Sequence, residues 1–240
     1  MSQLSQQIIQ HLQQQADPDK AKQLQRFFKT GPGEYAEGDL FLGIVVPKQR
    51  AIVRQFKKQI TWSDIQPLLI HPYHEVRLTG LLLMVELFQH SFAQQQAQLV
   101  KHYLAHTHYI NNWDLVDLSA PKILGQYLVD TQTNTTPKLL IKLAESDNLW
   151  ERRIAMLASF AYIKHHHYQT TIDLALLLIT DPHDLIHKAT GWMLREVGKQ
   201  DQLVLEQFLQ DHSQDMPRTA LRYSIERLPE SKRQFYLGKN

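Results

Sequence analysis

The chain has 240 residues, of which 43% are hydrophobic and 21% charged, so it can bury a core without disulfides or a structural metal. It contains no cysteine, which excludes disulfides, thiolate metal sites and cysteine nucleophiles and fits a reducing compartment. A net charge of +2 is too small to indicate nucleic-acid binding by itself. The Gln-rich start lacks the pattern of a signal peptide, and no apolar run could cross a bilayer, so we expect a cytoplasmic protein.

Helical periodicity dominates the sequence. The one β-like run, LFLGIVV at residues 40–46, is short. Proline residues that suit a first helical turn, such as Pro18, Pro72, Pro182 and Pro217, mark several helix starts. We predict helices at residues 4–15, 18–29, 47–59, 63–70, 73–89, 92–106, 111–130, 137–146, 149–164, 168–179, 184–199, 202–211, 216–227 and 229–236.

The sequence also repeats. Polar breaks followed by apolar-periodic helices begin at His71, Ile110, Ser146, Asp181 and Met216, every 35 to 40 residues. This is the period of HEAT-like repeats, in which two-helix units bury their apolar faces only by stacking. We therefore predict an all-α fold, a curved α-solenoid of HEAT-like two-helix repeats, that forms a single domain over residues 1–240.

The segment from Ile110 to Val129 carries the first candidate chemistry. Trp113 and Asp117 are four residues apart, so on a helix they share one face. An indole beside a carboxylate can cover an apolar or cationic group and stabilise positive charge. The alternative is that Trp113 belongs to the core and that Asp114 or Asp117 is a solvated or capping acid.

When the repeats are aligned on their breaks, further residues fall close to this face. Arg77, Leu115, Arg153 and Lys188 take near-equivalent positions, and Trp192 and Arg195 lie within about one helical turn of that line. Cations and tryptophans would then collect along one groove. The alternatives are a surface ion pair of Arg153 with Glu151 or Asp147, and ordinary core packing for Trp192.

Basic residues flank a short acidic loop, GPGEYAEGD at residues 31–39, which we expect at the surface, where it could close over a partner. The loop fits neither a P-loop nor a dinucleotide motif, and its acids would repel phosphate. Lys29 and Lys48 stand on either side of it and are candidate DNA contacts, although most charge runs are simply solvated helix faces. The histidines show no metal-ligand spacing and no GxSxG motif occurs, so we expect no metal and no serine nucleophile.

Four blocks in order resemble the AlkD-type DNA alkylation repair family: residues 27–50, INNWDLVDLSAP, NLWERRIA and IHKATGWMLREVGK. The resemblance runs from about Arg26 to the C-terminus. It implies a HEAT-like-repeat DNA glycosylase that removes N3- and N7-alkylated purines from double-stranded DNA, without deep base flipping. We expect no cofactor, and a monomer is the default expectation.

The resemblance also implies roles for matching positions. Asp117 corresponds to the catalytic aspartate, and Trp113 and Trp192 to tryptophans of the catalytic site. Arg153, Arg195 and the aromatic Phe27 correspond to DNA-binding positions. Some members carry tyrosine where this chain has Phe27, which lacks a hydroxyl.

The chemistry of these residue types agrees with that activity. An alkylated purine is already cationic and a good leaving group, so the carboxylate of Asp117 would need only to stabilise the oxocarbenium-like state and orient water. Two alternatives stay open: a non-catalytic HEAT-like module that binds distorted or branched DNA, and a protein–protein scaffold, the commonest use of such solenoids.

Overall fold

The computed structural model describes residues 1–131 and 135–238. The chain divides into two compact units, Met1–Ser119 and Ala120–Asn240, which are described separately. This boundary falls inside the segment predicted as one helix at residues 111–130. The single domain stays a prediction.

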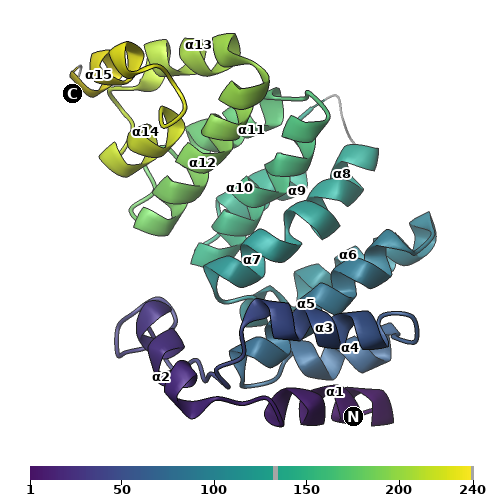
Figure 1. Ribbon diagram of the computed structural model, residues 1–240. Helices are drawn as coiled ribbons and strands as arrows, with labels where there is room; N and C mark the ends of the chain where they lie inside the picture. The colour runs from purple at the N-terminus through teal and green to yellow at the C-terminus, as the bar shows by residue number, and fades with distance from the viewer. Residues whose placement is uncertain (132–134, 239–240) are drawn as a thin grey trace. The chain divides into compact units, whose positions relative to one another are not determined.

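The N-terminal unit is built from helices. Figure 1 labels them α1 (Gln3–Gln13), α2 (Pro18–Phe27), α3 (Val46–Phe56), α4 (Trp62–Leu69), α5 (His74–Gln89), α6 (Ala93–Ala105) and α7 (Trp113–Ser119), with a 3₁₀ turn at Thr107–Tyr109. Helix α5 packs against α3, α4, α6 and α7. It is buried without interruption from residue 74 to 85, because neighbours cover it on all sides.

The C-terminal unit continues the same construction. It contains a π-turn (Pro121–Gly125) and the helices α8 (Gln126–Thr131), α9 (Lys138–Ala144), α10 (Leu149–Lys164), α11 (Gln169–Leu177), α12 (Asp184–Gln200), α13 (Gln202–His212), α14 (Arg218–Ser224) and α15 (Glu230–Gly238). Figure 1 shows α9 to α12 side by side, in agreement with their packing.

The helices that follow the predicted breaks pack on one another within each unit: α5 on α7, and α10 on α12 on α14. Their partners α4, α9 and α11 pack beside α5, α10 and α12. The prediction of an all-α fold of HEAT-like helix pairs is confirmed. None of the helices in the described part of the chain is both long and apolar enough to span a membrane.

Three of the breaks have the same local structure. The first residue of each, His71, Ser146 or Asp181, accepts the backbone N–H two residues later. Its own carbonyl accepts a side-chain hydrogen bond from the residue six positions later: Arg77, Arg152 or His187. The register predicted for the repeats was therefore wrong by one residue, since the equivalents of Arg77 are Arg152 and His187 rather than Arg153 and Lys188.

The helix predicted at residues 111–130 is interrupted because Pro121 has no N–H to donate to the carbonyl of Asp117. The backbone widens into the π-turn, where the Gly125 N–H reaches back to the carbonyl of Ala120 at 2.9 Å. A Cβ atom at Gly125 would lie 2.3 Å from the Ala158 carbonyl oxygen, so glycine permits the π-turn to approach α10.

The β-like run forms no strand within the described residues, only an isolated bridge between Leu40 and Tyr73. The buried Glu75 carboxylate instead accepts the N–H groups of Leu42, Gly43 and Ile44 at 2.8 to 3.1 Å. A charged side chain of α5 thus replaces a neighbouring strand as the partner of this backbone.

Candidate active site

Helix α7 carries Trp113 and Asp117 one turn apart, as predicted. The side chain of buried Asn112 accepts the N–H of Trp113 at 2.9 Å and so fixes the start of the helix. Trp113 and Asp117 are both half-buried, so neither is a plain core residue or a fully solvated one. Burial, and in addition the charge of Asp117, raises the pKa of Tyr103, whose hydroxyl pairs with Ser119.

An aromatic cluster surrounds the indole of Trp113. Phe28 stacks on it, with ring centroids 5.3 Å apart, and Phe27 meets it edge-on at 6.0 Å. Phe28 also stacks on Phe41 at 5.2 Å, and Phe41 on His74 at 4.6 Å. Phe27 is 63% exposed whereas Phe28 is 7% exposed, so the cluster extends from the core to the surface at Phe27.

A buried charge network lies beneath these rings. His74 donates through Nε2 to Asp114 at 2.9 Å, and its Nδ1 lies 3.5 Å from the carboxylate of Asp39. Arg77 binds the same Asp39 at 2.7 Å and Asn111 at 3.1 Å. Asp114 also accepts the N–H of Leu115, so the network is attached to the first turn of α7.

The pKa values in this network follow from its charges. Burial disfavours the charged form of His74, but Asp114 and Asp39 outweigh burial and raise the pKa of His74 to about 9. Burial likewise opposes ionisation of Asp39, but His74 and Arg77 outweigh it and lower the pKa of Asp39. Both groups are therefore charged at neutral pH.

The candidate DNA contacts Lys29 and Lys48 are exposed in the N-terminal unit. Lys29 ends α2 in the left-handed conformation, with φ at 55°, while the N–H of Thr30 reaches back to the carbonyl of Gln25. Lys48 lies in the first turn of α3. A cavity of about 350 Å³ beside the end of α2 is lined by Lys22, Gln25, Arg26, Thr30, Gly31 and Glu34.

In the C-terminal unit the candidate cations have protein partners. Arg153 is 4% exposed and donates to the carbonyl of Leu185 at 2.5 Å, which links α10 to the start of α12. Its neighbour Arg152 binds Asp181 at 2.6 Å. Arg195 pairs with Glu226.

The half-buried indole of Trp192 donates to Glu196 at 3.1 Å. Its ring lies near Phe160, with centroids 6.5 Å apart. Trp192 therefore differs from an ordinary core residue in that its polar edge faces a carboxylate. That carboxylate also accepts from Lys199.

Comparison with known proteins identifies the family. The sequence model described as DNA alkylation repair enzyme matches residues 8–228. The chain belongs to this family. Among solved structures, one described as a predicted DNA alkylation repair enzyme from Enterococcus faecalis is similar, with a TM-score of 0.71 at 18% sequence identity. The match covers 90% of this chain and 97% of that one and shows a shared fold. Curated proteins gave no match.

Several residues that surround the site in this family member were not identified from its sequence. Asp39 was predicted to lie in an acidic surface loop, but it is buried and holds Arg77 and His74. Glu34 and Glu37, the other two acids of the loop, accept backbone N–H groups of Gly31 and Gly33. The one available signal for the network was the acidic residue beside Trp113, at Asp114.

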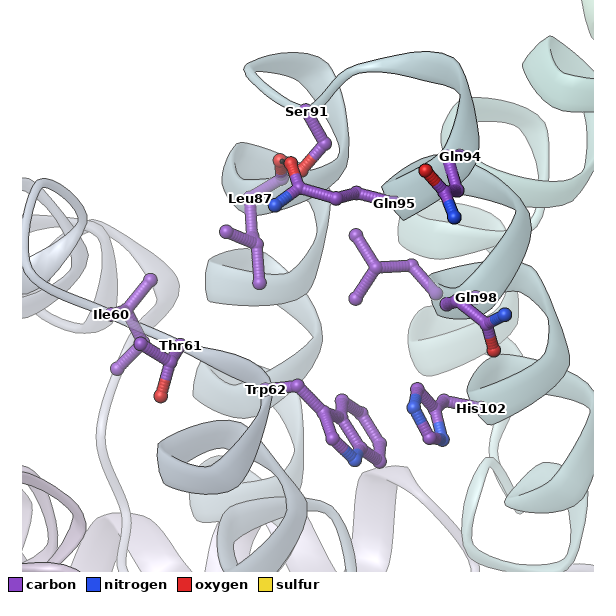
Figure 2. Close-up of a pocket in the computed structure, with 10 residues that line it drawn as sticks. Ile60, Thr61, Trp62, Leu87, Ser91, Gln94, Gln95, Gln98 and His102 are labelled. Carbon is purple, nitrogen blue, oxygen red and sulfur yellow. Dashed lines mark hydrogen bonds between the residues drawn. The ribbon is translucent and has the colours of Figure 1, made fainter.

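A separate cavity of about 500 Å³ lies between the start of α4, the end of α5 and α6. Figure 2 shows Trp62 and His102 side by side at one end of it, where their rings stack at 4.1 Å, and glutamines of α6 along its edge. Among the described residues, its lining includes no carboxylate. In this respect the cavity differs from the α7 site, which carries Asp117. In the parts of the chain described here, no group of three or more His, Asp or Glu side chains could hold a metal ion.

Proposed function

We propose that this DNA alkylation repair family member is an alkylpurine DNA glycosylase, which hydrolyses the N-glycosidic bond of cationic N3- and N7-alkylated purines in duplex DNA. The observation that carries the proposal is the combination on α7: a half-buried carboxylate, Asp117, one turn from an indole that contacts an exposed phenyl ring, Phe27.

The chemistry needs few groups. Alkylation makes the purine a cation, so the bond from C1′ to the base can break with its electron pair leaving on a base that becomes neutral. Positive charge then develops on C1′ and the ring oxygen of the sugar. We propose that Asp117 stabilises this charge and orients the water that attacks C1′, taking up the proton as the new C1′–O bond forms.

The aromatic groups would recognise the cation. The indole faces of Trp113 and Trp192 can each contribute on the order of 1–2 kcal/mol to a desolvated cation or sugar through cation–π and apolar contact. Phe27 would add an exposed apolar surface next to Trp113. Because the lesion supplies its own charge, we propose that excision proceeds without a deep base pocket.

We propose that backbone phosphates are held by Lys29 and Lys48, which are exposed, and by Arg153 and Arg195. Arg195 would have to exchange its ion pair with Glu226 for a phosphate. Arg153 would keep its bond to Leu185, and with it the position of α12, beside the phosphate that it contacts.

The test is release of 7-methylguanine from methylated duplex DNA, followed by chromatography. We expect wild type to release the base and Asp117→Asn to release it at least about 100-fold more slowly, with DNA affinity nearly unchanged. Asp215→Asn is the matched control, because Asp215 is an exposed acid outside α7, and we expect it to behave as wild type.

Equal release by wild type and Asp117→Asn would refute the catalytic assignment. No release by either, with binding to duplex DNA intact, would favour the non-catalytic DNA-binding alternative. Absence of DNA binding would favour a protein–protein scaffold.

A further inference from the structure

We infer that His74 and Asp114 are positioning residues for the α7 site: a pair of a buried imidazolium and a partly buried carboxylate that holds the first turn of α7, and with it Trp113 and Asp117, in the geometry needed for base release. This inference rests on the proposed glycosylase function for its kinetic consequence. Its structural part concerns the N-terminal unit alone.

The first argument is the attachment of α7. Asp114 lies between Trp113 and Asp117 in the sequence, and its carboxylate binds in two directions. Oδ1 accepts the N–H of Leu115 at 2.9 Å within α7, and Oδ2 accepts Nε2 of His74 from α5 at 2.9 Å. The rotation of the first turn of α7 is therefore fixed from α5 by one charge-assisted hydrogen bond.

The second argument is charge balance. His74 is 2% exposed and Arg77 4% exposed, and the carboxylates that face them are Asp39 and Asp114. The buried Asp39 and the partly buried Asp114 therefore meet two buried cations if the imidazole is protonated. A neutral imidazole would leave one negative charge without compensation, which is costly inside a protein. The neighbouring Glu75 carboxylate is stabilised separately, by three backbone N–H groups.

The third argument is the ring contact between His74 and the site. The imidazole stacks on Phe41, and Phe28 lies on both His74 and Trp113, with centroids 5.1 and 5.3 Å away. Movement of the imidazole is thus transmitted to the indole by two routes, through Asp114 along the backbone of α7 and through Phe28 across the rings. A displacement of about 1 Å at a reacting group can lower a rate about 100-fold.

Protonation of His74 provides the readout. Its pKa of about 9 means that titration between pH 7 and 10 removes the positive charge that faces Asp39 and Asp114. Arg77, the other cation of the network, keeps its charge over that range. A signal from Trp113 that follows this titration would report the coupling directly.

The experiment uses the full chain labelled with 5-fluorotryptophan, and the variants His74→Gln and Asp114→Asn. The ¹⁹F resonance of Trp113 is identified among the four tryptophans with Trp113→Phe. His102→Gln is the matched control, because His102 is also a ring-stacked histidine of the N-terminal unit, but it packs on Trp62. Circular dichroism establishes that each variant is folded at the temperature used.

We expect the wild-type Trp113 resonance to shift with a midpoint near pH 9, and the shift to disappear in His74→Gln but to persist in His102→Gln. We expect His74→Gln and Asp114→Asn to lower the single-turnover rate of 7-methylguanine release by about 10- to 100-fold, with the Kd for DNA changed less than about 3-fold. In an Asp117→Asn background, His74→Gln should lower release further by less than about 2-fold, because both changes act on one unit.

A Trp113 resonance that neither titrates in wild type nor moves in His74→Gln overturns the inference. So does a folded His74→Gln with the wild-type rate of release. Should the variants fail to fold, the wild-type titration still decides. If wild type releases no base, the glycosylase proposal fails instead, and the ¹⁹F titration tests the attachment of Trp113 independently.

Discussion

The ring of Phe28 lies almost parallel to the indole of Trp113, at an interplanar angle of 25°, while its neighbour Phe27 meets the same indole at 71°. Two consecutive residues at the end of α2 therefore contact one tryptophan of α7. Phe28 contacts it from the buried side and Phe27 from the exposed side. Because Phe28 supplies the packing, we propose that Phe27 contacts the ligand. Stability and function would then depend on different residues at adjacent positions.

Replacing Phe27 with alanine tests that separation. We expect Phe27→Ala to leave the thermal midpoint nearly unchanged and to lower base release about 5- to 30-fold, which corresponds to the loss of ~1–2 kcal/mol of contact with a cation. The control is Phe92→Ala, since Phe92 is 84% exposed at the start of α6 and should affect neither quantity. An unchanged rate in Phe27→Ala would remove this residue from the site.

Arg153 can be tested by the salt dependence of DNA binding. If it contacts a phosphate, Arg153→Ala should weaken binding and reduce the slope of log K against log salt by about one unit. Arg152→Ala is a demanding control, because Arg152 is the adjacent arginine. Its partners include the carboxylate of Asp181 and the backbone carbonyl of Ser146. A lower thermal midpoint with an unchanged slope in Arg153→Ala would make the residue an anchor of α12 only.

Two glycines at positive φ should differ sharply in their tolerance of alanine. Gly33 has φ of 76° and open space where a Cβ atom would lie, so Gly33→Ala should cost only the backbone strain, about 1 kcal/mol. Gly43 has φ of 85°, and a Cβ atom there would lie 2.0 Å from the backbone oxygen of Asp17. Gly43→Ala should therefore cost more than ~3 kcal/mol, measured by urea denaturation followed by circular dichroism. Equal midpoints would mean that the approach of Gly43 to α2 can relax.

We expect the stability of the fold to decrease at alkaline pH, because His74 loses its proton there. Its pKa rises from 6.5 in the unfolded chain to about 9 in the fold, so the proton stabilises the folded state fully below pH 6.5. That contribution is lost as the pH rises from 6.5 through 9. We expect the thermal midpoint of wild type to decline over this window and that of His74→Gln to decline less. Burial lowers the pKa of His71 and His102, so their effects appear on the acid side. Parallel curves for the two proteins would contradict the assignment.

The sequence predicted the helices well because their signals are local. Periodic apolar residues and N-terminal prolines gave the positions of α5, α10 and α12 to within about a residue or two. It predicted the spacing of Trp113 and Asp117 for the same reason, since i and i+4 geometry needs no tertiary information. The four sequence blocks that resemble the family implied the roles of the site residues. No contact in the structure tests those roles.

What escaped prediction depends on contacts between distant segments. Asp39 reaches Arg77 across 38 positions, and Glu75 reaches the segment at residues 42–44 across more than 30, so neither pairing has a sequence period. The run at residues 40–46 has the composition of a strand, but its backbone N–H groups bind the carboxylate of Glu75 rather than another strand. The one-residue register error arose because the repeats were aligned on their breaks as these stand in the sequence, whereas their equivalence is set by the bonds from Arg77, Arg152 and His187.

Those hydrogen bonds have a consequence for how repeats can be added to such a chain. At each of the three breaks, the turn and the side chain that closes it lie within seven consecutive residues, from His71 to Arg77, from Ser146 to Arg152 and from Asp181 to His187. A duplicated repeat would therefore carry its own complete helix start and would not depend on a neighbour to supply it. Gene duplication or design could then insert a whole repeat, and only the helix faces that meet the new neighbours would have to adapt.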